Sequence, residues 1–276
     1  MSTPSTNTPG SDTAFLGTLP ANYERYLVPL IFEPYAEDIV AQTAARRPKT
    51  VLETASGTGV VTRRLLRDLP GTAAITGTDL NQAMIDFASA TIGAANLNWR
   101  QADATALPFA DASFDTVVCQ FGAMFFPDRG KGYREALRVL RPGGALLFNV
   151  WDRLEANAFA RSITDALAAL FPLDPPRFLA RTPHGYHEAE RIGAELRTAG
   201  FREVRVETLP RTSRAANARD VALGYCRGTP LAGEIEARAP GALARVTEQV
   251  TAALAQRHGA GVIEGAIQAH RFIALH

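Results

Sequence analysis

One short turn carries the residues that are best suited to bind a ligand. It reads Glu53-Thr54-Ala55-Ser56-Gly57-Thr58-Gly59 and lies between an apolar stretch and a segment with helical periodicity. Gly57 and Gly59 have no Cβ atom and adopt positive φ without penalty, so their backbone allows a ligand to approach closely at the carboxyl end of a sheet. A tight strand-to-helix turn without a ligand has the same residue types, and both interpretations stay open at this stage.

An acidic residue, Asp79, lies 22 positions beyond Gly57 and favours the ligand interpretation. It ends the segment Thr76-Gly77-Thr78-Asp79, which has the character of a second strand. In an open α/β sheet, a carboxylate at this place accepts hydrogen bonds from the hydroxyls of a ribose. Asp79 equally suits the N-cap of the helix expected after it, and one residue can hold both roles. The spacing therefore indicates an adenosine-type ligand.

The residues of the turn also indicate which class of adenosine ligand is favoured. A dinucleotide fingerprint requires glycine or alanine where this chain has Thr62, and the Gly-Lys-Ser or Gly-Lys-Thr of a phosphate-binding loop does not occur. NAD and nucleoside triphosphates are therefore disfavoured, which leaves a ligand with a ribose but no pyrophosphate. Glu53 fits such a ligand, because a carboxylate repels phosphates and accepts a hydrogen bond from an ammonium group or a bound water. A solvated strand end is the alternative for Glu53.

The turn and Asp79 need a parallel sheet to bring them together, and the pattern between residues 49 and 151 predicts one. Short apolar runs alternate there with helical periodicity, which is typical of βαβ units. The expected strands are Lys49–Thr54, Ala73–Asp79, Asn98–Ala102, Thr116–Gln120 and Ala145–Val150. The expected helices are Val60–Leu69, Asn81–Ile92 and Gly130–Leu140, the last ended by the turn signal Arg141-Pro142-Gly143-Gly144.

Helical patterns dominate on both sides of this unit. Before it, Tyr23–Arg47 has helical spacing interrupted by Pro29 and Pro34, which predicts two short helices. After it, the expected elements are helices at Ala156–Leu170 and Glu188–Ala199, a strand from Gly200 to about Leu209, helical structure over residues 214–258 broken at Gly228 to Pro230 and at Pro240, and a last strand at Val262–Leu275.

The composition is that of an ordinary globular chain and argues against several partners. The 276 residues carry 29 basic and 28 acidic side chains, and the net charge of +1 without a polybasic patch disfavours nucleic acid and anionic membrane surfaces. Cys119 and Cys226 lack the spacing of a metal or redox motif, which indicates a reducing compartment. Residues 1–13 have the composition of a disordered tail and not of a signal peptide. No run reaches the ~20 apolar residues of a membrane helix, so we expect a soluble cytoplasmic protein.

Five motifs follow one another in the order found in a known family. They are Glu53 to Gly59, then Thr78-Asp79-Leu80 with Met84, then Gln101-Ala102-Asp103-Ala104-Thr105-Ala106-Leu107-Pro108-Phe109, then Ser113-Phe114-Asp115-Thr116-Val117-Val118, and finally Arg138-Val139-Leu140-Arg141-Pro142-Gly143-Gly144. Together they resemble the class I S-adenosylmethionine-dependent methyltransferases, in the small-molecule branch that includes the ubiquinone-biosynthesis type. The resemblance is strong over residues 20–151 and weak elsewhere.

The resemblance implies an α/β fold, with a Rossmann-like seven-stranded, mostly parallel sheet, helices on both faces and a helical lid from insertions after strands five and six. It implies S-adenosylmethionine as cofactor and S-adenosylhomocysteine as product. Glu53 and the turn would surround the methionine moiety, Asp79 the ribose, and Asp103 with Ala104 the adenine. Ala55 stands where the family usually has its first glycine, and Asp103 equally suits a loop-capping carboxylate. The cofactor-binding residues expected on this basis are Tyr23, Glu53, Thr54, Ala55, Ser56, Gly57, Thr58, Gly59, Asp79, Leu80, Met84, Ala102, Asp103, Ala104, Gln120 and Phe121.

Aromatic residues outside the motifs are candidates for covering the cofactor and binding the acceptor. The segment from Leu19 to Pro29 resembles the amino-terminal helix that covers the cofactor in related enzymes. Tyr23 would lie there, and a partly buried surface aromatic is the alternative. Phe125 and Phe126 either line a pocket for an apolar or planar acceptor or belong to the core.

The segment His184-Gly185-Tyr186-His187-Glu188 has two histidines three residues apart but no evident third metal ligand, so we expect no metal site there. In the resembling family, the loop before the next helix can border the acceptor site. Tyr186 or His187 is therefore a candidate proton acceptor, and a loop that leads into a helix is the plainer interpretation.

We therefore expect residues 14–276 to form a single methyltransferase domain after the tail at 1–13. Its cofactor-binding core would lie at about 48–151, with lid and acceptor-site segments at about 15–35, 153–187 and 210–260. The expected reaction is transfer of a methyl group by in-line displacement to a small-molecule acceptor, by a monomer or homodimer. Two alternatives are an aminopropyltransferase-like enzyme, which would need an acidic pocket for a polyamine, and a non-catalytic S-adenosylmethionine-binding protein, which would bind the cofactor without turnover.

Overall fold

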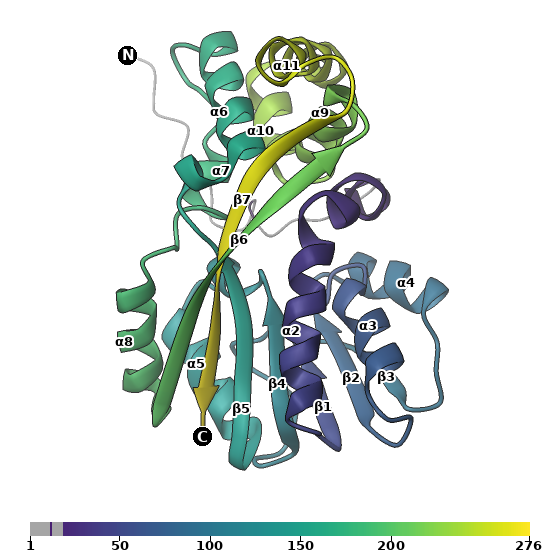
Figure 1. The fold of residues 1–276 in the computed structure, drawn as a ribbon, viewed down its shortest axis with the longest axis vertical. Coiled ribbons are helices and arrows are strands. Elements are labelled where there is room, and N and C mark those ends of the chain that lie inside the picture. Colours follow the sequence, from purple (N-terminus) through teal and green to yellow (C-terminus); the bar gives the residue numbers. More distant parts are fainter. Residues whose placement is uncertain (1–11, 13–18) are drawn as a thin grey trace.

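Seven strands form one mixed sheet that runs through the molecule (Figure 1). This computed structural model describes residue 12 and residues 19–276. The strand order is β3-β2-β1-β4-β5-β7-β6, in which β1 to β5 pair in parallel and β7 runs antiparallel to β5 and β6. The predicted Rossmann-like, mostly parallel sheet of seven strands is therefore confirmed. The strands are β1 (Thr50–Glu53), β2 (Ala74–Asp79), β3 (Leu97–Gln101), β4 (Phe114–Gln120), β5 (Leu140–Trp151), β6 (Glu203–Ala215) and β7 (Ile263–Leu275).

Helices cover both faces of the sheet, as parallel strands require. The side chains of Val51 in β1 and Val118 in β4 are 0% exposed. The helices on one face are α2 (Glu33–Ala45) and α3 (Val60–Asp68), and those on the other are α5 (Arg129–Val139) and α8 (Ala189–Ala199), while α4 (Gln82–Thr91) packs on β2 and β3 (Figure 1). The carboxyl ends of the parallel strands therefore meet at one edge of the sheet.

The amino-terminal helical region is one continuous run and not the two separate helices that were predicted. It consists of α1 (Leu19–Asn22), the π-helical segment η2 (Tyr23–Phe32) and α2, which follow one another directly. Pro29 lies inside the π-helical segment and Pro34 in the first turn of α2, and neither has an N–H to donate. The carbonyl oxygen of Leu30, four residues before Pro34, instead accepts a hydrogen bond from the hydroxyl of Ser213 at 2.7 Å. The helical run therefore continues through both prolines.

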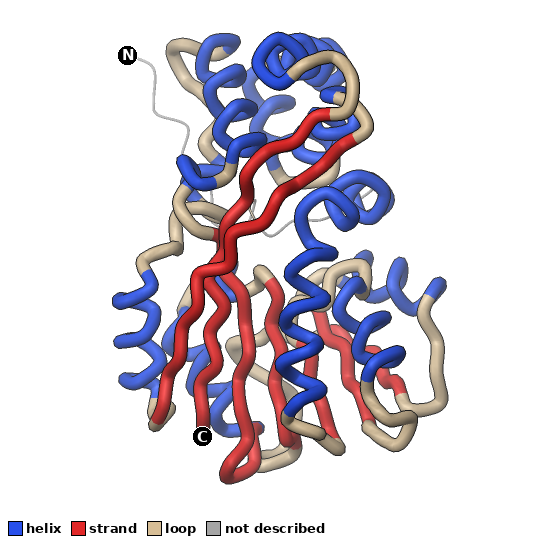
Figure 2. The backbone as a smooth tube through the Cα atoms, in the orientation of Figure 1, coloured by secondary structure: helices blue, strands red, loops and turns tan. Residues whose placement is uncertain are grey.

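Two strands are longer than their sequence signals predicted. The signal Arg141-Pro142-Gly143-Gly144 lies inside β5, beside a register shift between Phe114 and Thr116 of β4. Strand β6 continues past Leu209 to Ala215. Figure 2 shows β6 and β7 as a long antiparallel ribbon that extends beyond the sheet into the helices above it.

These helices form a layer over the carboxyl ends of the strands (Figure 1). After β5 come η4 (Leu154–Ala156), α6 (Ala158–Leu170) and the short, unpredicted α7 (Phe178–Arg181); between β6 and β7 come α9 (Ala218–Arg227), α10 (Leu231–Arg238) and α11 (Leu243–His258). The breaks between the last three lie at Gly228 to Pro230 and around Pro240, as predicted. The layer arises from the predicted insertions, and its action as a lid stays a prediction.

Three further predictions from the sequence concern the amino-terminal tail, the two cysteines and membrane helices. The predicted tail at residues 1–13 lies outside the described residues except for Asp12, whose carboxylate pairs with Arg181. Both cysteines are free and buried. None of the helices in the described part of the chain has the length and apolar content needed to cross a membrane.

Candidate active site

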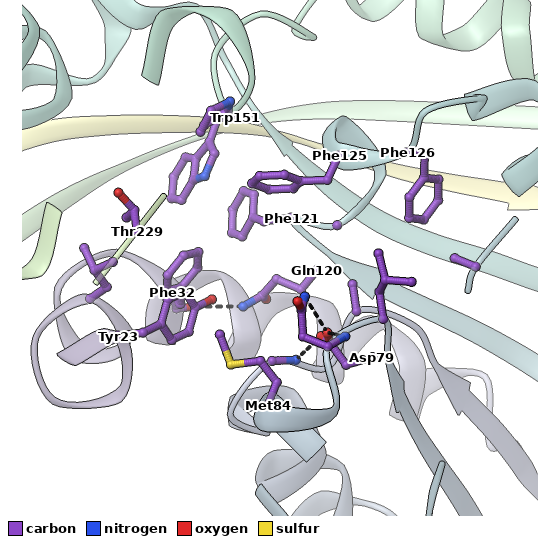
Figure 3. Close-up of a pocket in the computed structure, with 18 of the residues that line it drawn as sticks. Tyr23, Phe32, Asp79, Met84, Gln120, Phe121, Phe125, Phe126, Trp151 and Thr229 are labelled. Atoms are coloured by element: carbon purple, nitrogen blue, oxygen red, sulfur yellow. Dashed lines mark hydrogen bonds between the residues drawn. The ribbon is translucent and has the colours of Figure 1, made fainter. Parts of the chain in front are cut away.

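The carboxyl ends of the strands and the helical layer enclose a large cavity (Figure 3). It takes in about 1220 Å³ of space not filled by atoms, including its mouth to solvent. One side comes from the turn after β1, the end of β2 and the segments after β3 and β4. The other side comes from η2, α7, α9 and the end of β5. A ligand here would contact both elements that the sequence singled out.

Positive φ angles shape the turn after β1. Gly57 has a φ of 55° and Gly59 a φ of 89°, which glycine adopts without strain. A Cβ atom at Gly59 would lie 2.5 Å from Cδ1 of Ile92, so Gly59 is needed for close packing below the turn. Gly57 lines the cavity, and a Cβ atom there would meet only the ring of Tyr23, at 3.8 Å. Gly57 therefore gives a ligand access to the backbone.

Ala55 adopts the same left-handed conformation, with a φ of 53°, at the place where the resembling family has a glycine. This conformation costs an alanine roughly 1–2 kcal/mol. Gly122 follows β4 and faces Ala55 so closely that a Cβ atom added to Gly122 would overlap the Cβ of Ala55. The absence of a side chain at Gly122 thus leaves room for the methyl group of Ala55, and the turn keeps its shape.

Asp79 joins the turn to the end of β2. Its Oδ2 accepts a hydrogen bond from the N–H of Gly57 at 2.9 Å, and its Oδ1 accepts one from the N–H of Asn81 at 2.8 Å (Figure 3). Burial raises the pKa of Asp79, and these hydrogen bonds oppose the rise. The N-cap alternative for Asp79 is wrong, because α4 begins at Gln82 and its N-cap is Asn81.

Glu53 lies behind the turn and not at a solvated strand end. Its side chain is buried, and its Oε2 accepts a hydrogen bond of 2.5 Å from the hydroxyl of Thr62. Burial raises the pKa of Glu53 to about 8, and the bond from Thr62 only partly offsets this effect. The solvated alternative is therefore wrong, and Glu53 does not line the cavity.

The predicted cofactor residues divide into two groups. Those that line the cavity are Tyr23, Ala55, Gly57, Asp79, Leu80, Met84, Ala102, Asp103, Ala104, Gln120 and Phe121. Those that do not line it are Glu53, Thr54, Ser56, Thr58 and Gly59. Asp103 also accepts hydrogen bonds from the N–H and the hydroxyl of Thr105, at 2.7 and 2.8 Å, so it caps its own loop as well.

Tyr23 lies over the turn, where η2 begins (Figure 3). Its ring stacks on that of Phe32, with the centroids 4.9 Å apart. Burial and then the nearby carboxylate of Asp79 raise the pKa of Tyr23, so the hydroxyl stays protonated. Tyr23 is therefore a neutral hydrogen-bond donor that lines the cavity beside Gly57.

Aromatic rings make the rest of the cavity apolar. The rings of Phe121 and Trp151 stack with their centroids 3.9 Å apart and their planes 6° apart. The ring centroid of Phe32 lies 5.6 Å from that of Phe121 and 6.0 Å from that of Trp151. Phe125 and Phe126 are half-buried and line the same space, so the pocket alternative holds for both (Figure 3).

Several lining residues were not identified individually from the sequence. They are Leu27, Ile31, Phe32, Trp151, Asn157, Phe178, Leu179, Pro183, His184, Tyr225 and Thr229. All except Trp151 belong to segments expected to bind the acceptor. The sequence did contain a signal that Trp151 lines the cavity, because a large aromatic residue ends a buried strand at the carboxyl edge of the sheet.

Tyr186 and His187, the two candidate proton acceptors, do not line the cavity. The buried hydroxyl of Tyr186 hydrogen-bonds to the hydroxyl of Tyr133 at 2.9 Å and donates to Glu195 at 2.5 Å. The Nδ1 of His187 lies 2.9 Å from the carbonyl oxygen of His184. Of the three residues His184, Tyr186 and His187, only His184 lines the cavity.

Comparisons with known proteins decide the family. Residues 52–148 match the family model of the methyltransferase domain. The chain is 32% identical to a demethylmenaquinone methyltransferase of Deinococcus radiodurans over 173 residues, which are 59% of this chain and 71% of that protein. The chain belongs to the class I S-adenosylmethionine-dependent methyltransferases.

Further relatives of this methyltransferase support the assignment. It is 30% identical to the ubiquinone/menaquinone biosynthesis C-methyltransferase UbiE of Escherichia coli over 59% of its own chain and 70% of the relative. Two solved structures share its fold. One is phosphoethanolamine N-methyltransferase 2 of Haemonchus contortus, with a TM-score of 0.59 at 16% identity over 93% of this chain and 56% of that one. The other is the YcgJ protein of Bacillus subtilis, with a TM-score of 0.55 at 17% identity over 87% of this chain and 98% of that one.

The cavity of the methyltransferase suits S-adenosylmethionine. The turn offers a backbone surface that a Cβ atom at Gly57 would narrow, and Oδ2 of Asp79 has a second lone pair beside the one that accepts from Gly57. The Oε1 of Gln120 is buried without a hydrogen-bond partner in the described part of the chain. Among those residues there is also no group of three or more histidine, cysteine or acidic side chains that could hold a metal ion.

Proposed function

We propose that this methyltransferase transfers a methyl group from S-adenosylmethionine to a small, planar and largely apolar acceptor. The observation that carries the proposal is the division of one cavity into two ends. Asp79 and Asp103 lie with the glycine turn at one end, whereas stacked aromatic rings line the other. The names of two relatives, which are quinone-pathway methyltransferases, support an acceptor with a ring system.

The polar end would hold the cofactor. Asp79 would accept hydrogen bonds from the ribose hydroxyls, as carboxylates at the end of the second strand do in this architecture. Ala55 and Gly57 would contact the methionine part, and Asp103 with Ala104 the adenine. Tyr23 would cover the cofactor from the side of the helical layer, which its position over Gly57 supports.

The bound cofactor would supply an electrophilic methyl carbon on a sulfonium sulfur. In-line displacement needs no nucleophile from the protein, so the chain's own residues would act by orientation and by exclusion of water. Phe32, Phe121 and Trp151 would hold a planar acceptor by stacking, which ring-to-ring contacts favour. Their burial would keep water away from the reacting atoms.

Charge disfavours the aminopropyltransferase alternative. A polyamine carries several positive charges and needs carboxylates along its binding site. The acidic residues that line the cavity in the described part of the chain are Asp79 and Asp103, both at the proposed cofactor end. The apolar end therefore favours a neutral acceptor.

A direct test offers the purified protein S-adenosylmethionine together with either naphthohydroquinone or spermidine. The proposal expects mass spectrometry to detect one added methyl group on naphthohydroquinone, S-adenosylhomocysteine as co-product, and no product from spermidine. Binding of the cofactor without methylation of naphthohydroquinone would contradict the proposal and favour the non-catalytic alternative.

A further inference from the structure

Two polar side chains, His184 and Tyr225, lie among the aromatic residues of the cavity. They are 6% and 5% exposed, and both line the cavity. Their surroundings include Trp151, whose ring centroid lies 6.2 Å from that of His184, and Phe178. Neither Nε2 of His184 nor the hydroxyl of Tyr225 is among the fully enclosed polar atoms that lack a partner in the described residues. Since both side chains line the cavity, these two atoms are accessible from it and can pair with a ligand.

A backbone contact fixes the tautomer of His184. Its Nδ1 lies 2.8 Å from the carbonyl oxygen of Asp152. Because a carbonyl oxygen only accepts hydrogen bonds, Nδ1 carries the hydrogen and Nε2 has the free lone pair. Burial lowers the pKa of His184 to about 4, which keeps the ring neutral near neutral pH. No donor from the described residues reaches Nε2, so the lone pair is available to a ligand.

Tyr225 complements His184. Burial raises the pKa of its phenol, so the hydroxyl keeps its proton and can donate a hydrogen bond. The backbone carbonyl of Tyr225 accepts a hydrogen bond from Thr229 at 2.7 Å, whereas the phenol hydroxyl has no partner in the part of the chain that the structure describes. His184 and Tyr225 thus offer the cavity one hydrogen-bond acceptor and one donor, both uncharged.

We propose that the acceptor is a neutral hydroxylated aromatic compound and that Nε2 of His184 accepts the proton of its hydroxyl group during methyl transfer. This inference rests on the proposed function and names the acceptor class and the proton acceptor. The hydroxyl oxygen forms the bond to the methyl carbon while the carbon–sulfur bond breaks, and its electron pair stays on sulfur. The hydroxyl proton passes to Nε2 and leaves to solvent after the methyl ether departs. Tyr225 donates to an acceptor oxygen and orients the ring.

The ratio of the affinities for naphthol and for its methyl ether distinguishes a role of His184 as hydrogen-bond acceptor from a purely structural role. Calorimetry on protein saturated with S-adenosylhomocysteine should give a Kd for naphthol about ten-fold or more below that for the ether, because the ether has no hydrogen to donate. His184→Asn keeps a donor for the carbonyl of Asp152 but has no acceptor at the place of Nε2. The preference should therefore vanish in His184→Asn. It should persist in His258→Asn, which alters a histidine outside the cavity that bonds to Ser162.

Turnover gives a second readout. With S-adenosylmethionine, the unmodified protein should convert naphthol into its methyl ether, and His184→Asn should lower kcat by roughly a hundred-fold or more, as expected for loss of a general base. If His184→Asn fails to bind S-adenosylhomocysteine, His184→Leu replaces it, and the preference for naphthol over the ether should vanish in this variant too. Tyr225→Phe should weaken the binding of naphthol and of the ether alike, because the phenol of Tyr225 donates to the oxygen of either compound.

Three results would overturn the inference. They are equal affinity of the unmodified protein for naphthol and its ether, unchanged preference in a folded variant of His184, and methylation of a ring carbon instead of the oxygen. Each of them leaves cofactor binding intact. Failure of the unmodified protein to bind S-adenosylhomocysteine would instead overturn the proposed function, so the two failures are distinguishable.

Discussion

The backbone N–H of Gly57 donates a hydrogen bond of 2.9 Å to Oδ2 of Asp79 and so ties the turn after β1 to the end of β2. The two residues are 22 positions apart in sequence, and the parallel pairing of β1 with β2 brings them together. The carboxylate therefore has two tasks. It holds the turn in the shape that admits a ligand, and it presents the second lone pair of Oδ2 to that ligand.

The close approach of Ala55 and Gly122 predicts that their substitutions are coupled. Gly122→Ala should lower the free energy of unfolding by roughly 1–3 kcal/mol, because its Cβ would overlap that of Ala55 and lie 2.8 Å from Sγ of Cys119. Adding Ala55→Gly should recover part of this loss, since it removes one of the two contacts. Chemical denaturation of both single variants and the double variant measures the coupling. Strictly additive changes in the free energy of unfolding would contradict an energetic coupling between Ala55 and Gly122.

Glu53 should make stability depend on pH in a specific direction. Its carboxyl group ionises near its ordinary pKa of 4.5 in the unfolded chain and near 8 in the folded protein. Between these values the folded state holds more protons, so the free energy of unfolding should fall as the pH rises from 4.5 to 8. Glu53→Gln can still accept a hydrogen bond from Thr62 but cannot ionise. The free energy of unfolding of Glu53→Gln, relative to that of the unmodified protein, should increase with pH and level off above pH 8. A difference that is constant with pH would refute the neutral buried carboxyl group.

Tyr23 should contribute to cofactor binding mainly through its ring. Tyr23→Phe keeps the stack on Phe32 and should change the Kd for S-adenosylmethionine by less than about three-fold. Tyr23→Ala removes the cover over Gly57 and should raise the Kd by roughly ten-fold. Calorimetry compares the two variants. Equal losses in both would assign the role to the hydroxyl instead of the ring.

Trp151 should act on the acceptor and not on the cofactor. Trp151→Leu removes the stack with Phe121 and should raise the KM for an aromatic acceptor such as naphthohydroquinone by roughly ten-fold. The Kd for S-adenosylhomocysteine should stay unchanged, because Trp151 lies at the apolar end of the cavity. Leu173→Ala, at a side chain that is 99% exposed, serves as the control. Parallel losses of cofactor and acceptor binding would contradict the division of the cavity.

Sequence patterns predicted the sheet and much of the polar end of the cavity for physical reasons. Buried parallel strands such as β4 read as short apolar runs, and Gly57 and Asp79 are constrained by their backbone positions. The prediction of two separate helices at Pro29 and Pro34 was wrong, because the hydrophobic pattern does not show that a π-helical segment can accommodate Pro29. The sequence did not indicate that His184, and not Tyr186 or His187, lines the cavity, because the direction of side chains in an irregular loop depends on tertiary contacts such as the bond between His184 and Asp152. Glu53 could not be placed behind the turn because burial at a strand end has no local sequence signal.

The affinity for S-adenosylmethionine in the unmodified protein and in Asp79→Ala tests the central claim most directly. Calorimetry should show binding to the unmodified protein, and a Kd higher by at least about ten-fold in Asp79→Ala, because both a charged hydrogen bond and the tether of the turn are lost. Asp86→Ala, at an exposed carboxylate on α4, should bind like the unmodified protein. Equal affinity in Asp79→Ala, or no binding to the unmodified protein, would contradict the account.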